Sequence, residues 1–338
     1  MPSRLLLLLA LLSLRDGWFR HGDLAAQTPR PAAVWTDPAP HQIRFLRVTT
    51  DVQLELLDFG GSGPPVVFLS GLGDTGHSFD EFAPKFTDHW HVYAITRRGY
   101  GASSHPDSGY GMPRLAEDVR TVLDSLGLRN VTLIGHSLGG DELTRIAATW
   151  PERISKLVYL DAAHDRVALL DSLIGPDWPE DPPMTAADSV SPEAVRAYLA
   201  TVYGFRLNEA EVHEWFEYDT LGHMIRQRTP DSVGMKLILP HVEHPAYARI
   251  RARVLAFYDV PTSAEAMFPR FRSSDSTYQA RAIKAFIRSS EWTTRERERL
   301  RLEVPGARII ELRDSNHYVF VVSEAEVLRE TRRFLLER

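Results

Sequence analysis

Short apolar runs alternate with helix-like patterns along most of this chain, and that alternation limits the folds open to it. Strand-like runs cover a hairpin at 43–60, then 64–70, 91–96, 131–135, 156–162, 253–259 and 307–312. Helical patterns lie between most of them, such as 114–128, where Leu115, Val119 and Val122 share one face. Alternating strands and helices predict an α/β fold with a doubly wound, mostly parallel β-sheet. In such sheets the active site lies at the carboxyl ends of the strands.

One strand-to-helix junction has an unusual composition. The run at 131–135 leads into Gly135-His136-Ser137-Leu138-Gly139, and a helical pattern follows directly. A strand, Gly-x-Ser-x-Gly and a helix together are typical of a nucleophile elbow, in which the serine backbone is strained and the residues two positions away must be small. The serine oxygen then lies beside the N-terminus of the helix, whose partial positive charge favours an anion. Ser137 is therefore the candidate nucleophile.

With this motif in place, the sequence resembles the α/β-hydrolase superfamily from about Arg44 to Leu336. FLSGLGDTGHSF at 68–79 is similar to the family's oxyanion loop, and TRRGYGASS at 96–104 to its Arg-Gly-x-Gly-x-Ser turn. ERISKLVYLDAA at 152–163 resembles a later core strand and its lead-in, and DSNHYVF at 314–320 resembles the loop that carries the catalytic histidine. The resemblance implies a serine hydrolase whose triad follows the order serine, acid, histidine.

The general base and the oxyanion donors follow from chemistry and position. Serine needs a base to take its proton, and an imidazole suits neutral pH. The chain has 13 histidines, but His317 is the one placed between the last strand and the C-terminal helix, as the resemblance requires. The family pattern also assigns the backbone N–H groups of Leu72 and Leu138 to the oxyanion hole.

The acid of the triad is open on sequence grounds. The family usually places it a few residues beyond the strand at 253–259, but this chain has no acid at the usual spacing there. Some relatives use an acid after the preceding strand, and Asp161 occupies that place. We favour Asp161, with Asp259 as the main alternative and Glu265 or Asp165 as further ones.

Between residues 165 and 250 the alternation breaks, at the point where the family inserts a lid. Residues 192–205 and 208–225 read as amphipathic helices rich in aromatic residues. We expect a helical lid that contributes to an apolar pocket, with Trp178 and Trp215 as candidate substrate-binding residues. The core would then comprise residues 43–164 and 251–338.

The N-terminus resembles an export signal. Arg4 precedes an apolar run at 5–12, too short to span a bilayer, and small residues end near Ala26. We expect residues 1–26 to be a signal peptide or N-terminal anchor, and residues 27–42 to be a linker rich in Pro and Ala. The protein is expected to be secreted or periplasmic if the segment is a signal, and otherwise cytoplasmic. The charges at Arg15, Asp16 and Arg20 argue against a signal, because they shorten the apolar run. A wrongly chosen start codon or a frayed tail are the alternatives.

Composition narrows the function further. The net charge of −6 and the lack of a basic block argue against nucleic acid as a partner, and the absence of cysteine excludes thiolate chemistry and disulfides. We expect no cofactor, no metal and no obligate protein partner; His241 and His244 have metal-like spacing, but the chemistry needs no metal. The leading hypothesis is a carboxylesterase acting on a small molecule with an apolar part. The alternatives are cleavage of a C–C, lactone or amide bond by the same triad, or a non-catalytic or slow-turnover small-molecule receptor.

Overall fold

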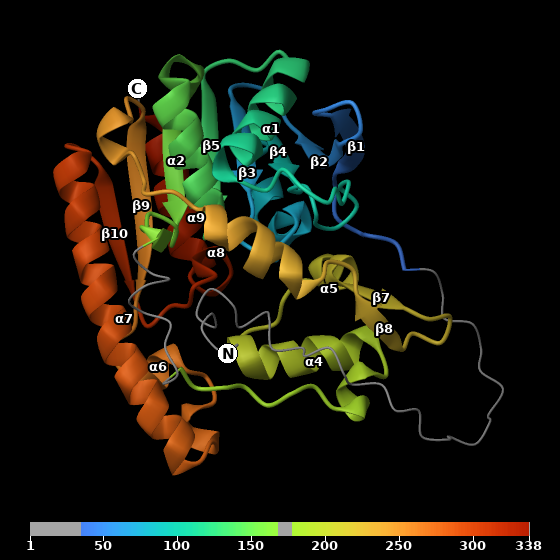
Figure 1. Ribbon diagram of the computed structural model, residues 1–338. Helices are drawn as coiled ribbons and strands as arrows, with labels where there is room; N and C mark the ends of the chain where they lie inside the picture. Colours follow the sequence, from blue (N-terminus) through green and yellow to red (C-terminus); the bar gives the residue numbers. More distant parts are fainter. Residues whose placement is uncertain (1–34, 168–177, 338) are drawn as a thin grey trace.

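The computed structural model describes residues 35–167 and 178–337, so the predicted signal segment at 1–26 and the first half of the predicted linker, 27–34, lie outside the described residues. Within them, one sheet has the strand order β1-β2-β4-β3-β5-β6-β9-β10 (Figure 1). Its strands are β1 Gln42–Arg47, β2 Gln53–Gly60, β3 Pro65–Leu69, β4 His91–Ile95, β5 Val131–His136, β6 Ile154–Leu160, β9 Arg253–Val260 and β10 Arg308–Arg313.

The sheet is antiparallel at one edge and parallel over the rest. β1 pairs antiparallel with β2, and β2 with β4, whereas every neighbouring pair from β4 to β10 is parallel. The α/β fold with a doubly wound, mostly parallel sheet is thus confirmed. The parallel arrangement brings the carboxyl ends of β3, β5, β6, β9 and β10 to one end of the sheet, where Ser137, Asp161 and His317 follow β5, β6 and β10.

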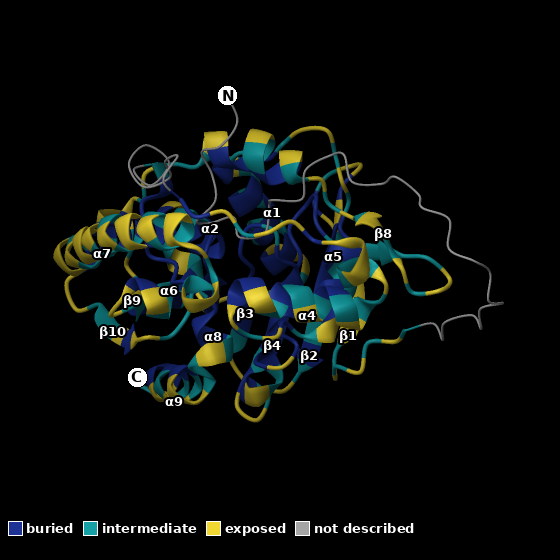
Figure 2. Ribbon diagram, turned by 90° about the horizontal axis from the view of Figure 1, so that it is seen from below, coloured by how far each residue is buried: buried dark blue, intermediate teal, exposed yellow. Residues whose placement is uncertain are grey.

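Both faces of the sheet are buried at its central strands. In β3, Val66 and Phe68 pack into a core on one face, and Val67 and Leu69 into a second core on the other. Fully burying such a side chain stabilises the fold by about 1.5–3 kcal/mol, which explains why these strands read as continuous apolar runs. Figure 2 shows the strands of the sheet largely buried and the outer side of α7 exposed.

Helices cover the two faces. Their bounds are α1 Met112–Ser125, α2 Gly139–Thr149, α6 Ala264–Met267, α7 Ser276–Glu303, α8 Val319–Val322 and α9 Glu324–Leu336. α1 and α2 supply Val119, Val122 and Ile146 to one core. α8 and α9 supply Phe320, Val327 and Phe334 to the other. None of the helices in the described ranges is both long enough and apolar enough to cross a bilayer.

The segment between β6 and β9 contains both helices and a small hairpin. Its regular elements are α4 Pro192–Tyr203, α5 Glu209–Trp215, β7 Phe216–Tyr218 and β8 Met224–Gln227. The expectation of one helix over 208–225 is wrong beyond Trp215, because β7 and β8 pair antiparallel there. The carboxylate of Asp219 accepts from the backbone N–H groups of Leu221 and His223, each at 2.8 Å. This side-chain turn competes with helical hydrogen bonding and connects β7 to β8.

Candidate active site

Ser137 lies in a sharp turn between β5 and α2. Its φ of +49° is in the left-handed region, which a non-glycine residue occupies at a cost of about 1–3 kcal/mol. The flanking glycines are required by space: a Cβ on Gly135 would lie 2.5 Å from Leu143 Cδ2, and one on Gly139 would lie 2.3 Å from the Leu69 carbonyl oxygen. The Gly-x-Ser-x-Gly motif therefore has the strained geometry expected of an elbow.

His317 and Asp161 meet from distant parts of the chain. His317 follows β10 and Asp161 follows β6, and His317 Nδ1 donates to Asp161 Oδ2 at 2.7 Å. Ser137, His317 and Asp161 all line one cavity of about 250 Å³. Because Nδ1 is engaged by the carboxylate, Nε2 is the ring atom left to exchange a proton with a substrate or nucleophile.

The surroundings of Asp161 favour its carboxylate form. Burial opposes ionisation, but hydrogen bonds from His164 and His317, together with their charges, lower its pKa well below the usual range. His164 Nε2 lies 3.4 Å from Oδ1, and the backbone N–H of Asp259 donates to the same oxygen at 3.1 Å. Asp161 is thus held as an anion facing His317.

The other candidate acids occupy different surroundings. Asp259 also lines the cavity, but burial and the charge of Asp161 raise its pKa to about 8. Asp165 pairs with His244 at 2.8 Å and with Arg299 at 2.6 Å, and Glu265 pairs with Arg272. Of the four acids, Asp161 is the one whose carboxylate contacts His317 in the structure.

The loop after β3 lies against Ser137. A Cβ on Gly71 would be 3.3 Å from Ser137 Cβ, and Gly71 and Leu72 both line the cavity. Leu138 is fully buried at the N-terminal end of α2. Leu72 thus lines the same cavity as Ser137, and Leu138 follows Ser137 at the start of α2. The assignment of their backbone N–H groups to an oxyanion hole stays a prediction.

A buried arginine fixes this loop. Arg97 donates to the carbonyl oxygens of Ser70 at 2.7 Å and Gly71 at 2.9 Å. Its Nε donates to Glu142 Oε1 in α2 at 2.6 Å. One planar guanidinium thus ties the loop after β3 to the helix that follows Ser137, and its several fixed donors suit this role.

A second polar group braces the loop that carries His317. His136 lies inside the elbow, where Nε2 is 3.1 Å from the His317 carbonyl oxygen and Nδ1 is 3.3 Å from Asp74 Oδ2. Tyr318 donates to Asp74 Oδ1 at 2.9 Å. Burial lowers the pKa of His136, and a neutral imidazole has a single N–H. In the tautomer that carries it on Nε2, the ring donates to the His317 carbonyl oxygen and so links the elbow to the loop of His317.

The two tryptophans predicted to bind substrate differ in position. Trp178 lines the cavity and packs on Phe268 with ring centroids 5.1 Å apart. Trp215 is not among the residues that line it; its indole N–H donates to buried Glu211 at 2.7 Å, and its ring packs in the core. The substrate-binding role predicted for Trp215 is therefore corrected to a core position. Further apolar lining residues are Val202, Met267, Tyr278 and Trp292.

Comparison with known proteins agrees with this geometry. The family described as "alpha/beta hydrolase fold" matches residues 64–210. Over these residues the chain matches the α/β-hydrolase family, and it has the fold of that family. This chain superposes on the crystal structure of E-2-(acetamidomethylene)succinate hydrolase with a TM-score of 0.59 and 19% sequence identity. The superposition covers 87% of this chain and 99% of that chain.

Similar curated sequences match only part of their length. A serine hydrolase-like protein of Danio rerio is 36% identical over 101 residues, which are 29% of this chain and 31% of that protein. A 2-(acetamidomethylene)succinate hydrolase of Mesorhizobium japonicum is 30% identical over 101 residues, which are 30% of this chain and 36% of that protein. The match thus spans about a third of these relatives, whose names indicate hydrolase chemistry for the family.

Sequence reasoning missed three polar residues around the site of this α/β-hydrolase. Arg97 directly precedes the Arg-Gly-x-Gly-x-Ser turn, which begins at Arg98, and this position offered a signal, since an arginine before a turn next to the active-site edge can reach backbone carbonyls. His164 lies three residues beyond Asp161 and contacts it. Asp74 had no distinguishing pattern, because an aspartate in a glycine-rich loop is common.

Proposed function

We propose that this α/β-hydrolase is a serine hydrolase that cleaves ester-like bonds, with carboxylesterase activity as the leading form. The observation that carries the proposal is the 2.7 Å hydrogen bond between His317 and Asp161 in the cavity that also contains strained Ser137. These three residues have the chemical types and the chain order of a serine triad on this fold.

The proposed reaction has two halves. Ser137 Oγ attacks the substrate carbonyl while His317 Nε2 takes the hydroxyl proton, and the backbone N–H groups of Leu72 and Leu138 stabilise the oxyanion. The tetrahedral intermediate expels the alcohol, which receives the proton from His317, and an acyl-enzyme remains. Water then loses a proton to His317 and attacks the acyl-enzyme, which releases the acid and returns the proton to Ser137. Asp161 stabilises the imidazolium in both halves.

The cavity favours an uncharged acyl group. Much of its wall is apolar or aromatic, including Trp178 and Phe268. The two arginines that line it already have acidic partners: Arg166 pairs with Asp141, and Arg297 lies 3.3 Å from Glu311. Since paired cations attract an anionic substrate weakly, we infer that substrates carry an apolar, uncharged acyl chain.

The test combines a fluorophosphonate probe with p-nitrophenyl esters of increasing acyl length. The wild-type chain should be labelled once, at Ser137, as shown by peptide mass, and should release p-nitrophenol with saturation kinetics. Ser137→Ala should lose labelling and reduce kcat by at least about 10³-fold. Labelling that persists in Ser137→Ala would disprove the nucleophile. A labelled enzyme that turns over no ester would favour C–C or amide cleavage, and neither labelling nor turnover would favour a receptor.

A further inference from the structure

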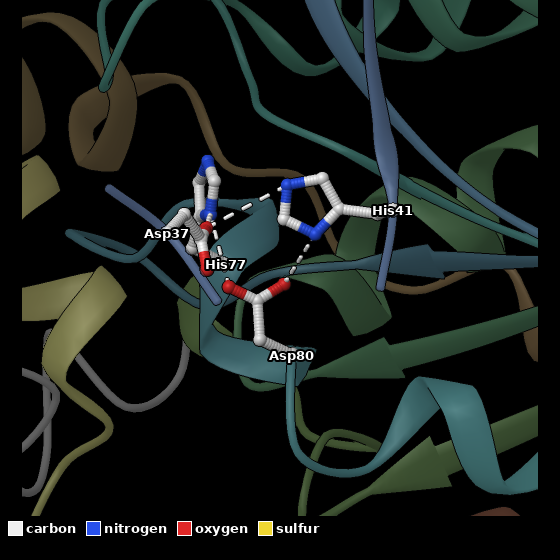
Figure 3. Close-up of side chains that lie close together, drawn as sticks. All are labelled: Asp37, His41, His77 and Asp80. Atoms are coloured by element: carbon white, nitrogen blue, oxygen red, sulfur yellow. Dashed lines mark hydrogen bonds and ion pairs between the residues drawn. The ribbon is translucent and has the colours of Figure 1, made fainter. Parts of the chain in front are cut away.

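Four metal-ligating side chains converge away from the catalytic cavity. Asp37 and His41 come from the segment ahead of β1, His77 from the short helical turn η1 Gly76–Phe79, and Asp80 from the residue after it. Figure 3 shows the two imidazoles and two carboxylates pointing toward one another. One nitrogen or oxygen from each lies within 4.8 Å of the corresponding atoms of the other three.

The spacing of these atoms suits a small cation. His77 Nδ1 lies 2.9 Å from Asp37 Oδ2 and 3.0 Å from Asp80 Oδ2, and His41 Nδ1 lies 3.3 Å from Asp80 Oδ1. Tetrahedral zinc with bonds of about 2.0–2.2 Å places neighbouring ligand atoms roughly 3.3–3.6 Å apart. Small side-chain movements would therefore convert the observed cluster into a coordination shell.

The cluster is buried and incompletely satisfied. The side chains of His41, His77 and Asp80 are 2%, 3% and 4% exposed. His41 Nδ1, Asp37 Oδ2 and Asp80 Oδ1 are buried without a hydrogen-bond partner. Buried polar atoms are normally paired, and these three have only ion-pair contacts within the cluster. A cation bound among them would contact all three at once.

The surroundings add negative charge and an outer ligand shell. Glu55 Oε1 lies 3.5 Å from His77 Nε2, on the side of the ring away from Asp37 and Asp80. The second oxygen of Glu55 accepts from Thr96 at 2.7 Å. A histidine that binds a metal through one nitrogen commonly donates its other N–H to a carboxylate, which orients the ring. Glu55 is placed to do this for His77.

We propose that Asp37, His41, His77 and Asp80 bind one divalent transition-metal ion of the zinc type. Two imidazole nitrogens and two carboxylate oxygens form a four-ligand set that suits Zn²⁺, whereas Ca²⁺ takes six to eight oxygens and Mg²⁺ retains water in an octahedral shell. With four protein ligands the site is closed, which is typical of a structural metal.

The ion would hold the segment ahead of β1 against the loop that leads from the catalytic end of the sheet. Asp37 and His41 precede the first strand, and His77 and Asp80 follow directly on the loop of Gly71 and Leu72. Trp35 already stacks on His213 at 4.2 Å between ring centroids, which provides a separate anchor for the same segment. Metal binding is therefore expected to stabilise the fold and to leave the chemistry at Ser137 intact.

The test uses the full chain, stripped with a chelator and titrated with Zn²⁺ by calorimetry. We expect one Zn²⁺ per chain with a dissociation constant of about 1 µM or tighter, and a higher melting temperature on binding. Asp37→Asn and Asp80→Asn should each weaken binding by roughly 100-fold or more. Asp37 lies outside every helix and strand, so Asp37→Asn keeps the test valid if Asp80→Asn fails to fold.

Two matched controls separate this site from other histidines. His223 pairs with Asp219 at 3.1 Å on the β7-β8 turn, and His244 belongs to the metal-like sequence pattern at 241–244. His223→Gln and His244→Gln should bind Zn²⁺ as the wild type does. The proposal is overturned if the folded wild type shows no saturable binding up to about 100 µM Zn²⁺, or if Asp37→Asn and Asp80→Asn retain wild-type affinity. Neither result would bear on labelling of Ser137.

Discussion

The backbone N–H of Asp259 donates to Oδ1 of Asp161 at 3.1 Å, so the two acids that compete for a place in the triad are in direct contact. The other oxygen of Asp161 accepts from His317 at 2.7 Å. Asp259 therefore helps to hold Asp161 through its main chain, while its own carboxyl group remains separate from His317.

This arrangement predicts a large difference between the two aspartates in catalysis. Asp161→Asn should reduce kcat/KM by roughly 10³- to 10⁴-fold, because an amide favours the wrong imidazole tautomer and cannot stabilise the imidazolium. Steady-state kinetics with a p-nitrophenyl ester would measure the loss, with circular dichroism as a check on folding.

Asp259→Asn is the matched control, because it keeps the backbone donor and removes only the carboxyl group. We expect less than about a 10-fold loss of kcat/KM for this variant. If Asp259→Asn proved the more damaging of the two folded variants, the acid would have to be reassigned to Asp259.

Asp259 should also make stability depend on pH. Its pKa is raised to about 8 in the folded chain, from 3.8, so between these values the folded state binds a proton that the unfolded state has lost. The free energy of unfolding therefore falls as pH rises through this range. Asp259→Asn has no carboxyl group to titrate, so its free energy of unfolding should not show this fall. The free energy of unfolding of Asp259→Asn minus that of wild type should therefore rise by roughly 2 kcal/mol or more from about pH 5 to about pH 8. Urea unfolding at several pH values measures the difference; parallel curves for the two proteins would contradict the prediction.

Trp178 should control acyl-chain selectivity, because it lines the cavity and packs on Phe268. Trp178→Ala enlarges the pocket and should shift the ratio of kcat/KM between long and short p-nitrophenyl esters by about 10-fold or more. Labelling by a small fluorophosphonate should change much less, since that reagent does not fill the pocket. An unchanged selectivity profile would assign Trp178 to packing alone.

Trp215 should affect stability instead. Trp215→Phe removes the N–H that Glu211 accepts at 2.7 Å in a buried position, and the loss of one buried hydrogen bond costs about 1–3 kcal/mol. Thermal unfolding measures this cost. A changed ester profile without a change in stability would return Trp215 to the substrate pocket.

Arg97 should act as a positioning residue for the oxyanion loop. Arg97→Lys keeps the charge but cannot reach Glu142 and the two loop carbonyls together, so kcat should fall by roughly 10-fold or more while KM changes little. Removing one partner of a buried pair altogether, as in Arg97→Ala, costs about 3–5 kcal/mol. Arg120→Lys, at the exposed pair with Glu117, is the control. It should change neither kcat nor the free energy of unfolding.

Much of the fold and part of the site are determined by the sequence alone. A parallel strand with helices on both sides buries both of its faces, so it needs a continuous apolar run. The alternation of such runs with helical patterns therefore predicts a mostly parallel sheet. Gly135 and Gly139 marked the elbow because any side chain there would collide with its neighbours. His317 could be selected among 13 histidines because it directly follows the last strand.

The partners of these residues were decided only by the tertiary structure. Asp161 follows β6 and Asp259 lies near the end of β9, and these two strands are adjacent in the sheet although 98 residues separate the two aspartates. Sequence spacing does not reveal which of the two carboxylates faces His317. Trp178 and Trp215 lie in one aromatic-rich segment, but only packing directs Trp178 to the cavity and Trp215 to Glu211. The cluster of Asp37, His41, His77 and Asp80 likewise forms because the chain ahead of β1 packs against η1. Contacts between segments far apart in sequence depend on strand order and on the direction of each side chain, and local patterns encode neither.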